Sequence, residues 1–186
     1  PYTSKQIRDA AFKLMDAIGN SATRINKGQQ CLIQLADGTK ANLKTAGKGG
    51  LMVKTRGMAN DSEIVGFNAD VSHILAAVRL PQEDIVNAYL IPLSVVEQAY
   101  RRNNREWCAL KPGRATDTWV LRFYNRNRKT YGDNMAAIWD EYRVGSISLI
   151  DSQQTMSPKA VLERSRANIA AAYGVEPEQV RIQVDL

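Results

Sequence analysis

VSHILAAVRLPQEDIVNAYLIP, residues 71–92, consists of two apolar runs on either side of a polar turn. VSHILAAVRL is apolar at nearly every position, which is typical of a buried strand. The segment from Pro81 to Asp84 has the composition of a turn, and NAYLIP predicts a second strand that ends at Pro92. The sequence therefore predicts two strands of a central sheet in this region.

The residues before this pair predict one helix and further strands. A capping box at Thr3–Gln6 opens an apolar pattern with helical spacing, which stops at Gly19–Asn20. Asp37–Gly38 lies between two β-like runs and predicts a hairpin, and LMVKT at 51–55 predicts the next strand. The range 57–68 is polar and rich in glycine and asparagine, so we expect a mobile loop there.

The residues after Pro92 alternate between helical and extended patterns. Ser94–Glu97 is a second capping box, and the helix that it opens is expected to end in the basic run RRNNR. KPGRATD, residues 111–117, predicts a loop, and residues 119–124 alternate as a strand does. NMAAIWDEYRV, residues 134–144, predicts a short helix.

The C-terminal residues predict a final helix and strand. Ser157 and Pro158 have the pattern of a helix start, and Gly174 has the pattern of a helix end. VRIQVDL closes the chain as an alternating strand, and residues 150–156 form the candidate linker before this unit. Interleaved helices and strands predict an α/β (mixed α+β) fold, with a central mixed sheet flanked by helices in one domain over residues 1–186.

Composition limits the partners and the catalytic mechanisms that the chain could have. The net charge of +6 and the isoelectric point near 9.4 favour anionic partners such as DNA. His73 is the single histidine, which excludes mechanisms that need several imidazoles, and Cys31 and Cys108 are expected to be buried thiols. No apolar run approaches the roughly 20 residues that cross a bilayer. We therefore expect a cytoplasmic protein without membrane insertion.

Positive charge is concentrated between Arg101 and Lys129. This segment has nine basic residues and two acids, a net charge of +7 that exceeds the +6 of the whole chain. Cations supply the phosphate contacts that dominate nucleic-acid affinity, and Trp107, Trp119 or Tyr124 could stack on unpaired bases. The alternative for Trp119 and Phe123 is the core face of a strand, and we favour it. The predicted DNA-binding residues are Arg101, Arg102, Arg105, Lys111, Arg114, Arg122, Arg126, Arg128 and Lys129.

The glycine-rich segment AGKGGLMVKTRG, residues 46–57, is a candidate phosphate site. Its glycines allow close backbone approach to a ligand, although the segment lacks the Walker motif. The alternative is a glycine-rich hairpin with solvated lysines. The position two residues before Lys54 is Met52, where one class of metal nuclease has an acid. The predicted nucleotide-binding residues are Lys48, Gly49, Gly50, Lys54 and Arg56.

Several strings along the chain support a family assignment. LADGTKANLKT, AYLIPLSVVEQAYR, TWVLRFYN, IWDEYRV and YGVEPEQVRIQVDL together resemble the plasmid fertility-inhibition factor family, from about Leu32 onward. The resemblance implies a plasmid-encoded cytoplasmic protein with a ParB/sulfiredoxin-like fold. It also implies that the protein binds and hydrolyses ATP, acts as a DNase, and blocks transfer of T-DNA or a competing plasmid through a type IV secretion system. GKGGLMVKTRG and KPGRATD are both possible positions for the phosphate loop of that fold.

The leading hypothesis is therefore an ATP-using, DNA-cleaving inhibitor of conjugative transfer. Because one histidine leaves few other routes, we expect hydrolysis that depends on a divalent metal, with magnesium as the expected ion. The metal ligands cannot be assigned from the sequence. The rival hypothesis is a non-catalytic inhibitor that coats DNA or docks on the secretion coupling protein or relaxosome. The acids predicted to position a metal or a water are Glu106, Asp117 and Asp140.

Overall fold

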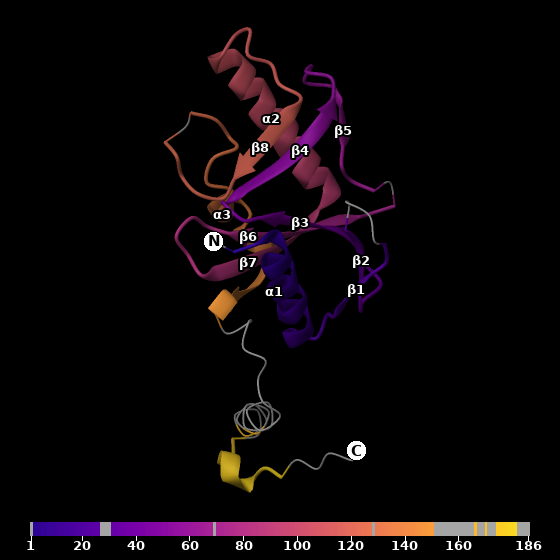
Figure 1. Cartoon of the computed structure of the whole chain (residues 1–186), viewed down its shortest axis with the longest axis vertical. Helices are drawn as coiled ribbons and strands as arrows, with labels where there is room; N and C mark the ends of the chain where they lie inside the picture. The colour runs from indigo at the N-terminus through magenta and orange to yellow at the C-terminus, as the bar shows by residue number, and fades with distance from the viewer. Residues whose placement is uncertain are drawn as a thin grey trace. The chain divides into compact units, whose positions relative to one another are not determined.

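The computed structural model describes residues 2–26, 31–68, 70–127, 129–150, 166, 170 and 174–181. The chain divides into two compact units, Pro1–Ser152 and Gln153–Leu186, and the boundary falls inside the predicted linker (Figure 1). The prediction of a single domain over residues 1–186 stays a prediction. Most of the predicted helix 157–174 and strand 180–186 lies outside the described residues.

The first unit is built on a six-stranded mixed sheet, which confirms the predicted mixed α+β class (Figure 1). The strand order is β1-β2-β3-β6-β7-β9, and every pairing is antiparallel except that of β3 with β6. The strands are β1 (Ala22–Arg24), β2 (Cys31–Leu35), β3 (Lys40–Ala46), β6 (His73–Arg79), β7 (Ile85–Pro92) and β9 (Arg143–Ser148).

The two strands predicted from residues 71–92 are inner strands of this sheet. Side chains of β6 alternate between two cores: Ile74, Ala76 and Val78 face one, whereas Leu75 and Ala77 face the other. Because both faces are covered, a continuous apolar run is the expected sequence of such a strand. The prediction of a buried strand is confirmed.

Helix α1 (Ser4–Ala17) covers one face of the sheet, and the predicted capping box is present. The Gln6 backbone N–H donates to Thr3 Oγ1 at 3.2 Å, and the Thr3 backbone N–H donates to Gln6 Oε1 at 2.8 Å. The apolar stripe of α1 from Ile7 to Met15 is buried. Burial of that stripe supplies most of the stabilisation of the helix.

A second layer covers the opposite face of the sheet. It consists of a three-stranded antiparallel sheet in the order β5-β4-β8, together with a long helix and a short one. Its core contains Trp119, Phe123 and Trp139, each at most 2% exposed, so the core alternative for the two strand aromatics is confirmed. The elements are β4 (Gly50–Arg56), β5 (Glu63–Val65), α2 (Leu93–Leu110), β8 (Thr118–Arg122), α3 (Met135–Ile138) and the 3-10 helix η1 (Asp140–Tyr142).

Helix α2 differs from its prediction at both ends. It begins at Leu93 with Pro92 as N-cap and without a side-chain cap, so the predicted capping box at Ser94–Glu97 is wrong. The Leu93 N–H donates to the Ser72 carbonyl at 2.9 Å, a tertiary contact that replaces the local cap. The helix also continues through the basic run to Leu110.

Three short strands, β1, β5 and β9, have no signal in the sequence. Strand β5 interrupts the predicted loop 57–68, and β9 contains Gly145 and two serines in place of an apolar alternation. Short edge strands depend on partners that are distant in sequence, so local pattern does not reveal them. Within the described residues, no helix combines the length and apolarity that a bilayer span requires.

Candidate nucleic-acid interface

The glycine-lysine segment forms a tight turn that connects the two sheets. The Gly49 N–H donates to the Ala46 carbonyl at 3.1 Å, and Gly49 has a φ of +67°. A Cβ on Gly49 would lie 2.7 Å from the Tyr124 ring. Both the backbone angle and the packing of Tyr124 therefore require glycine here without any ligand.

The remaining predicted nucleotide-binding residues extend along β4. Lys54 Nζ lies 3.1 Å from Asp117 Oδ1, and an Arg56 guanidinium nitrogen lies 3.2 Å from Glu63 Oε2. Lys48 is exposed in the turn before β4, and Gly50, at the start of the strand, lies roughly 13 Å from Lys54 at the rise of an extended chain. The structure does not bring Lys48, Gly49 and Gly50 together with Lys54 and Arg56.

The three predicted catalytic acids lie on three different elements, and each has a cationic partner. Glu106 on α2 pairs with Arg102 at 3.2 Å and also accepts the Tyr131 backbone N–H. Asp140 in η1 pairs with Arg143 at 3.2 Å, and Asp117 pairs with Lys54. Among the described residues, no group of three or more His, Cys, Asp or Glu side chains is arranged to hold a metal ion.

Asp117 provides a pH-dependent prediction. A hydrogen bond from Lys54, then one from the Thr118 hydroxyl, lowers the Asp117 pKa below its ordinary value of 3.8. A lowered carboxyl pKa stabilises the fold above the pKa of the unfolded chain, and this stabilisation is lost as pH falls through the folded pKa. We therefore expect Asp117→Asn to be slightly less stable than wild type at pH about 6, and this difference to shrink as pH falls through the folded pKa of Asp117.

Urea unfolding across that pH range measures this effect. Asp117→Asn in a Lys54→Met background is the control, because the main cause of the shift is then already absent. An equal effect of Asp117→Asn in both backgrounds would contradict the assignment of the shift to Lys54.

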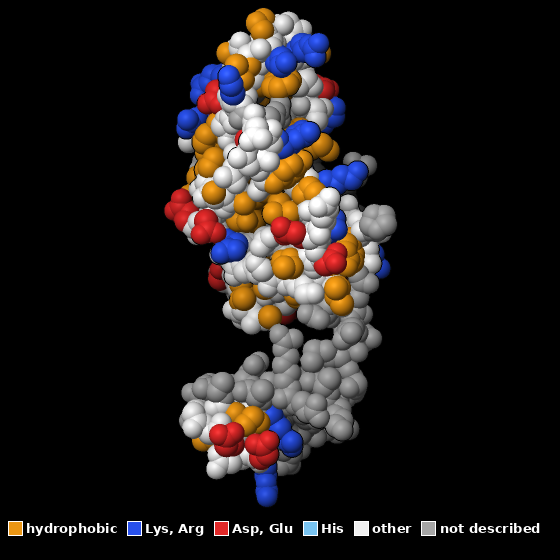
Figure 2. Space-filling model, turned by 90° about the vertical axis from the view of Figure 1, so that its left-hand side faces the viewer, with side chains coloured by type: hydrophobic (Ala, Val, Ile, Leu, Met, Phe, Trp, Pro, Cys, Tyr) orange, Lys and Arg blue, Asp and Glu red, His pale blue; other side chains and the backbone are white. Residues whose placement is uncertain are grey.

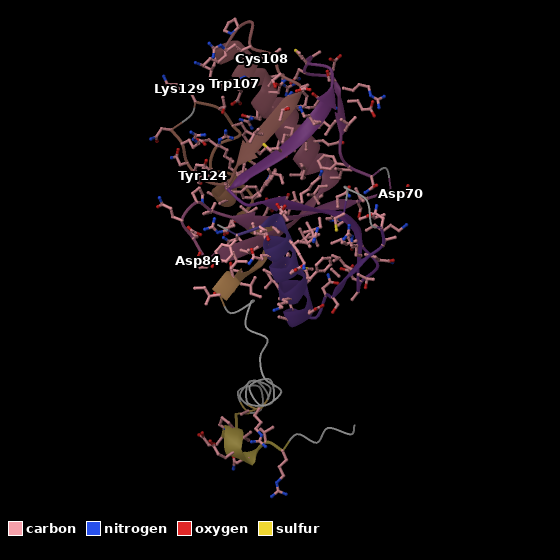
Figure 3. The ribbon with its side chains drawn as sticks, viewed as in Figure 1. Asp70, Asp84, Trp107, Cys108, Tyr124 and Lys129 are labelled. Atoms are coloured by element: carbon pink, nitrogen blue, oxygen red, sulfur yellow. The ribbon has the colours of Figure 1, made fainter. Side chains whose placement is uncertain are left out.

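Four of the predicted DNA-binding residues meet in one hollow. Lys111, Arg122, Arg126 and Lys129 line a groove of about 590 Å³ near the end of α2, and no acid is among the described residues that line it. Trp107 and Lys129 both face this region (Figure 3). We call this hollow the basic groove; it is lined by Trp107, Leu110, Lys111, Arg122, Arg126, Lys129 and Thr130.

In Figure 2, Lys and Arg side chains are spread over the upper part of the first unit, with a few acidic side chains among them. Lys111, Arg126 and Lys129 are exposed, and Arg122 is partly buried. Clustered cations on one side of the fold raise the local concentration of anions. Four of the nine predicted DNA-binding residues line the basic groove, and their binding to DNA stays a prediction.

Other predicted DNA-binding residues have structural contacts. Arg101 donates to the Asn60 carbonyl at 2.9 Å and to the Ser62 carbonyl at 3.2 Å, and so holds the loop before β5. The Arg102 guanidinium lies 4.2 Å from the centre of the Tyr131 ring and pairs with Glu106. Arg105 on α2 and Arg114 in the loop 111–117 are exposed, and neither lines the basic groove. Arg128 lies outside the described residues.

One wall of the basic groove is fixed to α2 by two side chains. The Asn103 amide donates to the Val120 carbonyl at 2.9 Å and accepts the Gly132 N–H at 2.9 Å. One turn later, Glu106 accepts the Tyr131 N–H. Asn103 and Gly132 are buried, and a Cβ on Gly132 would lie 2.3 Å from the Asn103 amide carbon. Glu106 therefore positions the groove wall.

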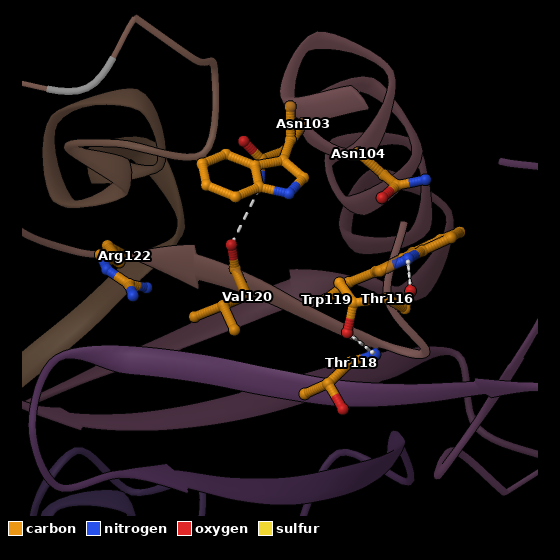
Figure 4. A pocket seen from close by; sticks show the side chains of 8 residues that line it. Asn103, Asn104, Thr116, Thr118, Trp119, Val120 and Arg122 are labelled. Atoms are coloured by element: carbon orange, nitrogen blue, oxygen red, sulfur yellow. Dashed lines mark hydrogen bonds between the residues drawn. The ribbon is translucent and has the colours of Figure 1, made fainter. Parts of the chain in front are cut away.

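A smaller hollow of about 150 Å³ adjoins the basic groove (Figure 4). The Trp119 indole N–H donates to the Thr116 carbonyl at 3.2 Å, and the Thr118 N–H donates to Thr116 Oγ1 at 3.1 Å, so this wall is held in place. We call the smaller cavity the side hollow. Its lining residues are Asn103, Asn104, Thr116, Thr118, Trp119 and Val120, together with Trp107 and Arg122, which also line the basic groove.

The sequence did not single out Asn103, Gly132 or Thr130 as parts of an interface. Asn103 and Asn104 break the apolar pattern of α2 at positions that are buried, and that break is the one signal in the sequence that could have marked them. Cys31 and Cys108 are free thiols, as predicted, with Cys31 buried and Cys108 partly buried. Comparison of the chain with protein-family models, curated proteins and solved structures gives no match.

Proposed function

We propose that this chain inhibits plasmid DNA transfer by holding DNA in the basic groove. The observation that carries the proposal is the convergence of Lys111, Arg122, Arg126 and Lys129 on one hollow, with no acid among the described residues that line it. Three of these cations, Lys111, Arg126 and Lys129, are exposed and repel each other, and a bound phosphate backbone relieves that repulsion. The fixed groove wall adds to this, because a prearranged site loses less entropy on binding.

The biological context comes from the family resemblance. It supplies a ParB/sulfiredoxin-like fold, a cytoplasmic location, and a block on the passage of T-DNA or a competing plasmid through a type IV secretion system. It also supplies ATP hydrolysis and metal-dependent DNA cleavage, with magnesium as the expected ion. These activities belong to the proposal through the resemblance alone.

Binding is the part of the proposal that the geometry supports best. Lys54 and Arg56 are paired with Asp117 and Glu63, which reduces their availability to nucleotide phosphates. Glu106 holds the groove wall and is thereby committed to a positioning role. An inhibitor that coats DNA needs neither a site for nucleotide phosphates nor a catalytic acid.

Retention of labelled DNA on a filter across a salt series tests the proposal. We expect the logarithm of the affinity to fall linearly with the logarithm of salt, with a slope of about −2 to −3 for the three phosphate contacts of Lys111, Arg126 and Lys129. The same protein sample is also assayed for plasmid nicking, with and without EDTA, and for turnover of radiolabelled ATP. Salt-sensitive retention without nicking supports the binder, nicking that EDTA stops supports the enzyme, and no retention at low salt refutes the proposal.

A further inference from the structure

We infer that the basic groove prefers single-stranded DNA to duplex, and that an unpaired base stacks on Trp107 beside the side hollow. The inference rests on the proposed function, because it names the form of DNA that the same groove takes.

Trp107 is the one tryptophan of the three that lines a hollow and also lies outside the core. Its partly buried indole borders both the basic groove and the side hollow, whereas Trp119 and Trp139 are each 2% exposed. Proteins that hold single strands combine a cation-lined groove for the phosphates with an aromatic face for the bases. The basic groove and Trp107 bring these two elements together within one lining.

The form of DNA follows from where the bases lie. In a duplex each base is stacked between its neighbours, so an aromatic side chain reaches its face only if the base is taken out of the stack. A single strand presents the faces of its bases freely. Duplex DNA would therefore gain only the phosphate contacts of Lys111, Arg126 and Lys129, whereas a single strand would gain these and the indole.

The side hollow is suited to one planar group. Its volume of about 150 Å³ is well below the roughly 300–1,000 Å³ of sites that enclose a whole ligand. The polar side chains of the side hollow already have partners: the Asn103 amide is bonded to Val120 and Gly132, the Asn104 amide donates to Asn60, and the Thr118 hydroxyl donates to Asp117. A base on Trp107 would therefore be held by stacking, with its phosphates on the cationic side.

Intrinsic fluorescence tests the stacking directly. Trp139 lies in the core and Trp119 borders the side hollow with 2% of its surface exposed, so the quenching by an oligodeoxythymidine strand of about 16 nucleotides reports mainly on Trp107. We expect quenching with wild type and none with Trp107→Phe. Quenching that persists in Trp107→Phe would overturn the inference.

Affinities for the strand and for its duplex with oligodeoxyadenosine complete the test. We expect Trp107→Ala to weaken strand binding roughly 5- to 150-fold, the equivalent of one stacked base, and Trp107→Phe to retain most of the affinity. Duplex binding should change by less than about twofold, because phosphate contacts remain. Circular dichroism and a thermal melt check that both variants are folded.

The two failures can be told apart. Equal wild-type affinity for strand and duplex without quenching overturns the inference and leaves the basic groove as a DNA site. Failure to bind either form overturns the proposed function together with the inference.

Discussion

The triple variant Lys111→Ala, Arg126→Ala, Lys129→Ala should lose DNA affinity by roughly 100-fold at 0.1 M monovalent salt. Each phosphate contact contributes about 0.7 to the salt slope for single strands and about 0.9 for duplex, so the slope should fall by about 2 to 3. All three side chains are exposed and line the basic groove. Exposed substitutions of this kind usually change stability by less than about 0.5 kcal/mol each, so the variant should fold.

A charge-matched control separates the groove from net charge. The control also removes three positive charges, but from exposed positions on α1 and at the start of β3: Lys5→Ala, Lys13→Ala and Lys40→Ala. We expect its affinity to stay within about threefold of wild type, since screening limits distant charges. Comparable losses in both triple variants would mean that binding follows total charge, and the basic groove would lose its assignment.

Gly132→Ala should destabilise the protein by about 2–4 kcal/mol. Its Cβ would lie 2.3–2.4 Å from three atoms of the Asn103 amide, and no real contact is that short. Moving the amide would break its hydrogen bonds to Val120 and Gly132 and leave buried polar groups unpaired. Gly132 is not in the left-handed region, so the cost comes from the clash and not from backbone strain.

Two comparisons isolate this cause. Gly113→Ala in the adjacent loop has open space at its Cβ but a φ of +78°, and should cost only about 1–2 kcal/mol of backbone strain. In an Asn103→Ala background the clash is absent, so Gly132→Ala should cost at least about 1 kcal/mol less than in wild type. Urea unfolding gives the free energies of unfolding of Gly113→Ala, Gly132→Ala, Asn103→Ala and the double variant. If the costs of Asn103→Ala and Gly132→Ala simply add in the double variant, the role assigned to Asn103 is refuted.

The parts of the fold that depend on local pattern were predictable from the sequence. The capping box at Thr3–Gln6 and the continuous apolar run of residues 74–78 each specify an element through neighbouring residues. The start of α2 at Leu93 could not be found in this way, because its first N–H is paired with Ser72 some twenty residues away. The edge strands β1, β5 and β9 could not be predicted for the same reason, because their pairing partners are distant in the sequence.

The candidate site also combines features that composition predicts with features that depend on residues distant in the sequence. The basic character of residues 101–129 is a property of composition, and four of its nine cations line the basic groove. The pairing of Lys54 with Asp117 spans 63 residues and joins neighbouring strands, so no local motif signals it. Composition alone could not separate Arg101, which holds a loop, from Arg126, which lines the groove.

The arrangement of the three-stranded sheet affects the order in which the interface can assemble. Strand β4 belongs to the excursion between the parallel neighbours β3 and β6, while β8 arrives after α2 and pairs with β4 roughly 70 residues upstream. Before β8 arrives, β4 presents an open edge on one side, and such edges recruit other chains. A nascent chain that has not yet reached residue 122 therefore lacks Arg122, Arg126 and Lys129 of the basic groove, and one edge of its β4 is unpaired.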